Sequence, residues 1–171
     1  LDVTRIEGKS LRVHRESFDL DIVIHSALED TKNATRVDDE RSTQLEFQYE
    51  SKGPIFVFAD KGRISQIIYN LLANSIKFTH EGYIRVTVER KSREIIVSIS
   101  DSGKGIDPEI IPRLFAKFST KSETGTGLGL FICKNIVEAH GGKIWAENNT
   151  HDRGSTFSFS LPVNGTNNRK Y

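Results

Sequence analysis

Two asparagines lie on the polar side of a stretch that otherwise has the pattern of an apolar helix. Residues 66–82 read QIIYNLLANSIKFTHEG, so Asn70, Asn74 and Lys77 follow one another at intervals of four and three. This spacing places the three side chains on one face of a helix. A solvent-facing side is one interpretation, although Asn costs roughly 0.5 kcal/mol relative to Ala in a helix interior. The other interpretation is that the amides bind a ligand.

A second candidate group is DSGKGI, from Asp101 to Ile106, which follows a predicted strand at residues 94–100. Gly103 and Gly105 allow a backbone path that side chains would block, so the main chain can approach a flat ligand closely. Asp101, at the strand end, would act as a fixed hydrogen-bond acceptor. An ordinary turn is the alternative, because Asp-Ser-Gly is also common turn chemistry.

A third group is GTGLGL, residues 125–130, at the start of a predicted helix. Its three glycines expose backbone N–H groups at a helix N-terminus, where the aligned peptide dipoles favour an anion such as a triphosphate. The stretch follows a loop and reads G-x-G-x-G, which is not the dinucleotide-binding pattern that follows a strand. No Walker A sequence is present.

Other periodicities predict the elements that must position these groups. The apolar side of the asparagine helix is formed by Ile67, Ile68, Leu71, Leu72, Ser75 and Ile76. Strand patterns occur at 11–18, 44–50, 55–59 (a buried strand), 83–90, 94–100, 143–149 and 155–162, and further helix patterns at 20–35 and 128–139. Strands 83–100 and 143–162 form two hairpins, so the elements do not alternate as βαβ units. We therefore expect an α+β fold, a two-layer sandwich whose mixed, mostly antiparallel sheet has three helices packed on one face.

Composition limits the classes of protein that this chain can be. The 171 residues suit one domain, and 24 basic against 23 acidic side chains leave a net charge of +1, with no basic footprint for nucleic acid. The longest apolar run, residues 55–59, is far shorter than the roughly 20 residues that span a bilayer. A single cysteine, Cys133, excludes an internal disulfide, and its apolar helix face favours burial over a reactive role. The chain has no methionine and begins at Leu1, which is typical of an excised fragment.

In this order, the groups resemble the motifs of the nucleotide-binding domain of sensor histidine kinases, within the Bergerat-fold ATP-binding superfamily. QIIYNLLANSIKFT resembles the N box, DSGKGI the first glycine box, LFAKFST (114–120) the phenylalanine box and GTGLGL the second glycine box. The resemblance covers residues 10–163, and the order of four boxes makes it specific. It implies ATP and Mg²⁺ as cofactors.

The resemblance also implies roles for single residues. Asn74 would supply an amide oxygen to Mg²⁺, and Asn70 and Lys77 would contact phosphates. The implied nucleotide-binding set further comprises Phe78, Asp101, Gly103, Gly105, Ile106, Phe118, Gly125, Thr126, Gly127, Leu128, Gly129 and Thr156. In the family's pattern, Phe78 would pack on the adenine, and Asp101 would accept a hydrogen bond from the exocyclic amine of adenine. Thr156 would support Asp101 or a bridging water. Residues 119–124 resemble the ATP lid, and Lys117 or Lys121 would approach the phosphates, with solvated lysines as the equal alternative.

The position of Asn70 separates the activities found in this superfamily. Hydrolytic relatives carry a glutamate there as general base, and an amide cannot take that role. The resemblance therefore implies phosphoryl transfer to histidine, for which this domain supplies positioning and charge stabilisation. A nucleotide-gated interaction module is the alternative, and an ATPase is third. None of His14, His25, His80, His140 and His151 lies in a sequence that resembles the family's phosphoacceptor box.

The acceptor is therefore expected on a separate dimerisation domain. Residues 1–9 resemble the end of that domain's helix hairpin, residues 10–163 form the ATP-binding catalytic domain, and residues 164–171 form a flexible tail. We expect this fragment to be a cytoplasmic monomer that touches neither membrane nor nucleic acid, within a homodimeric parent that can be membrane-anchored. A response regulator is the expected downstream partner.

Overall fold

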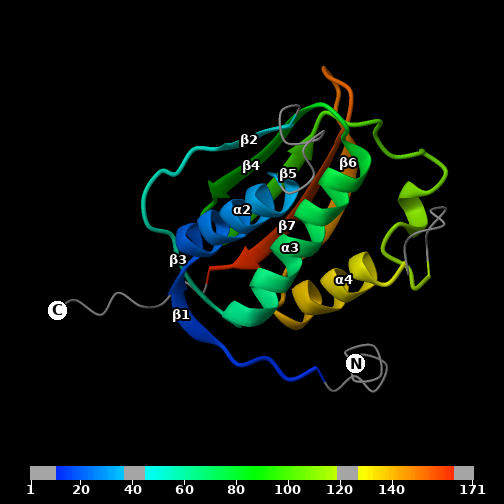
Figure 1. The fold of residues 1–171 in the computed structure, drawn as a ribbon. Helices are drawn as coiled ribbons and strands as arrows, with labels where there is room; N and C mark the ends of the chain where they lie inside the picture. The colour runs from blue at the N-terminus through cyan, green and yellow to red at the C-terminus, as the bar shows by residue number, and fades with distance from the viewer. Residues whose placement is uncertain (1–10, 37–44, 119–126, 164–171) are drawn as a thin grey trace.

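The computed structural model describes residues 11–36, 45–118 and 127–163 (Figure 1). Its elements, in chain order, are β1 (Glu16–Asp19), α2 (Leu20–Arg36), β2 (Leu45–Tyr49), β3 (Phe56–Ala59), α3 (Lys61–Phe78), β4 (Gly82–Arg90), β5 (Glu94–Asp101), the 3₁₀ turn η1 (Ile111–Arg113), α4 (Gly129–Ala139), β6 (Ile144–Asn148) and β7 (Ser155–Pro162). The expected stub, ATP lid and tail lie outside the described residues.

The strands form a five-stranded sheet in the order β2-β4-β5-β7-β6 and a separate ribbon of β1 and β3. Strand β2 runs parallel to β4, and every other pair is antiparallel. Helices α2, α3 and α4 cover one face of the large sheet (Figure 1). The predicted α+β sandwich and both predicted hairpins are confirmed.

Strand alternation decides which side chains face the helices. In the central strands, the odd-numbered residues of β5 and β7 point to the helix layer and are buried. These residues are Ile95, Val97, Ile99, Phe157, Phe159 and Leu161. Asp101 is the last residue of β5 and is also odd-numbered, so its carboxylate lies on the helix side of the sheet.

Helix α3 carries the asparagines and is held at its N-terminus by a polar junction. Asp60 caps it, because its Oδ1 accepts from the backbone N–H of Arg63 at 3.1 Å. The backbone N–H of Asp60 in turn donates to Nε2 of His140 at 3.0 Å, and Nδ1 of His140 lies 2.8 Å from the carbonyl oxygen of Ile136. The start of α3 is thereby joined to the end of α4 through the imidazole of His140.

Two strand predictions need correction. The pattern at 11–18 becomes a strand only from Glu16, because the preceding backbone turns to the helix ends instead: His14 N–H donates to the Asp60 carboxylate at 2.9 Å. The strand predicted at 55–59 forms as β3, but it is not buried throughout: Val57 and Ala59 are buried, whereas Phe56 and Phe58 are 64% and 59% exposed. Among the described strands, β3 pairs with β1 alone, and this ribbon has one covered face, so alternate residues face outward.

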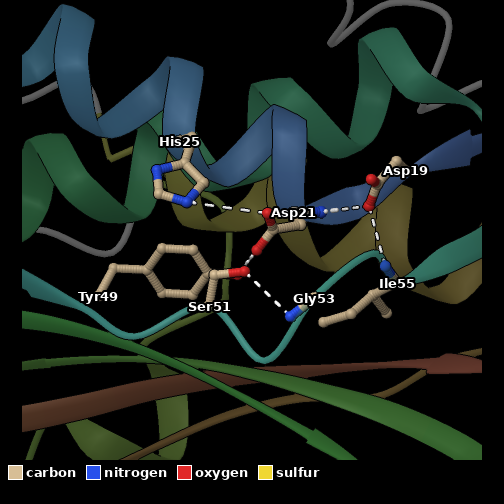
Figure 2. A network of polar contacts seen from close by, with 7 residues as sticks. All are labelled: Asp19, Asp21, His25, Tyr49, Ser51, Gly53 and Ile55. Atoms are coloured by element: carbon tan, nitrogen blue, oxygen red, sulfur yellow. Dashed lines mark hydrogen bonds and ion pairs between the residues drawn. The ribbon is translucent and has the colours of Figure 1, made fainter.

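A polar network attaches the edge strand β2 to α2 (Figure 2). The Tyr49 hydroxyl donates to Oδ1 of Asp21 at 2.6 Å, and Nε2 of His25 lies 3.7 Å from the other carboxylate oxygen. Nearby, Asp19 accepts from the N–H groups of Asp21 and Ile55. Among the described strands, β2 pairs with β4 alone, so these side-chain contacts add to the attachment of an edge strand.

Among the described residues, no helix is both long and apolar enough to cross a membrane.

Candidate functional site

Asp101 lies at the end of β5 as a buried carboxylate with fixed partners. It is 2% exposed. Oδ1 accepts from the N–H groups of Gly103 at 3.0 Å and Ser155 at 3.3 Å, and Oδ2 accepts from the Ser155 hydroxyl at 2.9 Å. Because Oδ2 retains acceptor capacity, it can still receive a hydrogen bond from a ligand N–H.

The support expected from Thr156 comes from Ser155 instead. Thr156 pairs across the strands with Ser100, and its hydroxyl lies 2.6 Å from the Ser100 hydroxyl and donates to Oδ1 of Asn149 at 2.7 Å. Adjacent residues of a strand point to opposite faces, so Thr156 lies behind the sheet and Ser155 lies on the side of Asp101. The parity of the predicted hairpin could have indicated this.

Glycines around Asp101 let neighbouring backbone segments approach one another closely. A Cβ atom at Gly103 would lie 2.4 Å from the Phe78 carbonyl oxygen, and one at Gly154 would lie 1.9 Å from the Asp101 carbonyl oxygen. Gly105 has a φ of +78°, the left-handed region that favours glycine. The first glycine box is therefore a tightly fitted loop between the end of α3 and the β6–β7 hairpin.

Two hydroxyls on α3 and at its end are buried and have no hydrogen-bond partner among the described residues. Ser75 and Thr79 are both 1% exposed. The Thr79 Oγ1 and the Asp101 Oδ1 lie 2.8 and 3.0 Å from the position that a Gly103 Cβ would occupy, so they border one small space. An unpaired buried hydroxyl is costly, which indicates that this space accommodates a polar ligand atom or a water molecule.

Phe78, at the end of α3, is flanked by two cations. The Nζ atoms of Lys104 and Lys77 lie 4.9 and 5.5 Å from its ring centroid. Lys77 was predicted as a phosphate contact, whereas Lys104 was missed because a lysine inside a glycine loop gives no spacing signal. Both ammonium groups lie where α3 meets the Asp101 loop.

Asn70 forms the contact between α3 and the start of α4. Its Nδ2 donates to the Cys133 sulfur at 3.6 Å, and a Cβ at Gly129 would lie 3.9 Å from its Oδ1. Cys133 is fully buried as expected, and burial raises the pKa of its thiol to about 12. Asn74 lies one turn further along α3 and is half-buried.

The start of α4 is where we predicted an anion cradle. Gly127 has a φ of +66°, helix α4 begins at Gly129, and among the described residues its N-cap residue Leu128 supplies no side-chain cap. Asp60, by contrast, caps the start of α3, so the two helix starts differ in a property that matters for anion binding. Phe118 has a φ of +58° and is exposed, with Nζ of Lys117 5.0 Å from its ring centroid. Gly125, Thr126 and Lys121 lie outside the described residues.

Two hollows of the described surface lie away from these residues. One of about 500 Å³ and one of about 450 Å³ open on the sheet face away from the helices, where Arg85 of β4 lines both. Neither contains Asn70, Asn74 or Asp101. Among the described residues, no group of three or more His, Cys, Asp or Glu side chains could hold a metal.

Comparison with known proteins matches residues 59–165 to the family described as Histidine kinase-, DNA gyrase B-, and HSP90-like ATPase. The chain belongs to this family. Within this ATPase family, it is 39% identical over 128 residues to the sensor protein FixL of Bradyrhizobium diazoefficiens, a stretch of 72% of this chain and 25% of FixL. The chain thus spans about a quarter of that relative.

Solved structures of the ATPase family confirm the fold. The catalytic domain of histidine kinase ThkA superposes with a TM-score of 0.77 at 35% identity, over 87% of this chain and 95% of that domain. Full-length ShkA in complex with AMPPNP superposes with a TM-score of 0.80 at 25% identity, over 93% of this chain and 33% of ShkA. ThkA has also been solved with the response regulator TrrA, with a TM-score of 0.74 at 32% identity, over 94% of this chain and 46% of that ThkA chain. The resemblance to histidine kinase catalytic domains is confirmed.

Proposed function

We propose that this ATP-binding domain binds Mg-ATP and donates the γ-phosphate to a histidine on a separate dimerisation domain of the same protein. The observation that carries the proposal is the buried Asp101 carboxylate, held by Ser155 and Gly103 beside the unpaired Thr79 hydroxyl. The crystallised complex of ShkA with AMPPNP supports an adenine nucleotide as the ligand.

The residues present fit adenine. Its exocyclic amine is a donor that Asp101 can accept, and the Thr79 hydroxyl can donate to a ring nitrogen or to a water between them. Guanine presents a carbonyl where adenine has the amine, so Asp101 would face an acceptor and the base would be rejected. Gly103 and Gly105 let the loop pack closely against Phe78, Thr79 and Asn148, which fixes the backbone beside Asp101.

The residues also fit a triphosphate with Mg²⁺. Asn74 supplies an amide oxygen, the kind of hard ligand that Mg²⁺ prefers, and the phosphates carry the negative charge. When bound, the ion neutralises charge on the phosphates. The donors at the start of α4 and the ammonium of Lys77 hold phosphate oxygens, and Asn70 orients them through its contact with α4.

The chain contributes positioning and not proton abstraction. By the resemblance, Asn70 takes the position at which hydrolytic relatives carry a glutamate as general base, and an amide cannot accept a proton at neutral pH. A neutral imidazole nitrogen is already a nucleophile. Its attack forms a P–N bond, breaks the bond between the γ-phosphorus and the bridging oxygen, and releases ADP, while the imidazolium proton passes to water or to a carboxylate beside the acceptor.

The remaining assignments belong to the same proposal. Residues 1–9 are the end of the dimerisation hairpin, residues 10–163 the catalytic domain and residues 164–171 a tail, and the parent is a cytoplasmic or membrane-anchored homodimer. A response regulator receives the phosphoryl group, as the complex of ThkA with TrrA suggests.

Labelled ATP tests the proposal. The domain is mixed with the parent's histidine-bearing dimerisation domain, with and without Mg²⁺, and the phosphorylated product is analysed. We expect acid-labile phosphohistidine that depends on Mg²⁺ and is lost in Asp101→Asn. Tight ATP binding without transfer would instead favour the nucleotide-gated interaction module. Steady-state phosphate release that Asn74→Ala abolishes would favour an ATPase.

A further inference from the structure

We propose that Asn148, at the end of β6, is a positioning residue that clamps the base-pocket loop through both backbone groups of Ile106. The Ile106 N–H donates to Oδ1 of Asn148 at 2.6 Å, and Nδ2 of Asn148 donates to the Ile106 carbonyl oxygen at 2.7 Å. The inference rests on the proposed function, because it takes this loop to be a wall of the pocket that binds the nucleotide base.

The chemistry of the clamp suits an amide. Asparagine has an acceptor oxygen and a donor nitrogen on one planar group, so it can pair with a peptide N–H and C=O as a neighbouring strand would. An ionised aspartate could accept but not donate, and its charge would oppose the Ile106 carbonyl. A side chain without polar atoms would leave both backbone groups of Ile106 without these partners.

The clamp holds the far end of a loop whose near end is held elsewhere. Ser102 N–H donates to the Tyr83 carbonyl at 3.1 Å, and Lys104 N–H donates to the Phe78 carbonyl at 3.4 Å. Ile106, which packs against the core, is the last of these contacts. A Cβ at Gly105 would lie 2.9 Å from Oδ1 of Asn148, so the clamp and the glycine fit each other.

The next residue, Asn149, connects the Asp101 side of the pocket to the same end of β6. Nδ2 of Asn149 donates to the Asp101 carbonyl at 2.9 Å. Asn148 also pairs across the strands with Ser155, whose hydroxyl holds the Asp101 carboxylate. The end of β6 thus sets the spacing between Asp101 and Ile106, the two sides of the base pocket. No such contact reaches Asn70 or Asn74 in the described residues.

A first experiment tests the clamp without any nucleotide. Amide hydrogen exchange at Ile106 is compared among the wild type, Asn148→Ala, Asn148→Leu and the control Asn135→Ala, whose amide donates within α4 to the Phe131 carbonyl. Both Asn148 variants remove the oxygen that accepts from the Ile106 N–H, so we expect at least a tenfold faster exchange there in both and no change in the control. Unchanged protection in both variants would overturn the clamp. If Asn148→Ala does not fold, Asn148→Leu, which keeps the size of the side chain, gives the answer.

A second experiment asks whether the clamp serves base recognition. Affinities for ATP and GTP are measured with and without Mg²⁺. In Asn148→Ala we expect ATP to bind about tenfold more weakly, GTP to change less, and the gain in affinity from Mg²⁺ to persist. Asn74→Ala should show the converse, with the Mg²⁺ gain lost and the ATP-to-GTP ratio kept. Equal losses for ATP and GTP in Asn148→Ala would show a merely structural residue and overturn the proposal.

The two experiments distinguish a failure of the proposed function from a failure of the clamp. If the wild type binds no nucleotide, the proposed function fails, and the exchange result still decides whether Asn148 clamps the loop. If the wild type binds ATP and the clamp is absent, the function stands without the clamp.

Discussion

At the residue scale, the proposed site depends on the Asp101 carboxylate, part of whose hydrogen-bonding capacity is already used by groups of the protein. Asp101 receives two bonds at Oδ1 and one at Oδ2, which fixes the direction in which the free acceptor points. Such a preorganised group can distinguish ligands that differ by one donor, because a mismatched partner leaves a buried polar atom unpaired.

The substitution Asp101→Asn tests this role. The amide oxygen can still accept from Gly103 and Ser155, but the amide nitrogen then faces the adenine amine, donor against donor. We expect a fold that survives and a loss of about 1–3 kcal/mol of binding, roughly tenfold to a hundredfold in Kd for ATP. Calorimetric titration measures it, and an unchanged Kd would contradict the assignment.

A glycine behind Asp101 allows a second prediction. Gly154 has a φ of +110°, and a Cβ there would lie 1.9 Å from the Asp101 carbonyl oxygen. Gly154→Ala should therefore lower the free energy of unfolding by clearly more than about 1 kcal/mol, measured by urea denaturation. Gly53→Ala is the matched control, since Gly53 has a φ of +101° with no atom within 4 Å of its Cβ position. Equal losses in the two variants would mean that the carbonyl contact does not matter.

At the element scale, edge strand β2 relies on side chains as much as on its ladder. Tyr49 packs edge-on against His25 with ring centroids 5.0 Å apart and donates to Asp21 (Figure 2). Burial raises the pKa of the Asp21 carboxyl, but bonds from Tyr49 and Ser51 and the nearby His25 outweigh it and leave the pKa lowered. Burial and Asp21 together raise the pKa of Tyr49.

These directions give a pH dependence. A lowered Asp21 pKa adds stability above its ordinary value of about 4, and this stability is lost as pH falls through the folded-state pKa. A raised Tyr49 pKa adds stability below about 10, which is lost as pH rises through the folded-state pKa. We expect Tyr49→Phe to lower the free energy of unfolding by about 1 kcal/mol at pH 7 and by less near pH 3.

Urea denaturation at pH 3, 7 and 10 measures this difference. Tyr69→Phe is the control, because Tyr69 of α3 also donates to a carboxylate, Asp30 of α2, but at an exposed position. It should cost little at any pH. A Tyr49→Phe cost that is the same at pH 3 and pH 7 would rule out the Asp21 contact as its source.

At the scale of the whole molecule, the proposed site draws on α3, β5 and α4, so we expect nucleotide binding to stabilise the fold. A ligand that binds only the folded state adds about 2.7 kcal/mol at one hundred times its Kd. For a domain of this size that raises Tm by roughly 5–10 °C. A thermal unfolding scan with Mg-ATP should show this rise, and Asp101→Asn should lose most of it. A rise of the same size with GTP would count against adenine recognition.

The sequence predicted the main elements and the motifs, but not which strand faces are exposed. The asparagine helix, both hairpins and the glycine boxes have strong local signals, namely apolar periodicity, turn residues and a motif order. The exposure of Phe56 and Phe58 could not be predicted, because an apolar strand in a sheet centre and one in an outer ribbon have the same composition.

The sequence alone determined the family, the α+β class and the residue types that form the site, because the boxes and periodicities are local and keep their order along the chain. Only the tertiary structure decided which hydroxyl holds Asp101, that Asn148 and Asn149 donate to the carbonyl groups of Ile106 and Asp101, and that β3 pairs outside the main sheet. These outcomes depend on strand register and on contacts between residues more than forty positions apart. Neither propensity nor spacing encodes such contacts.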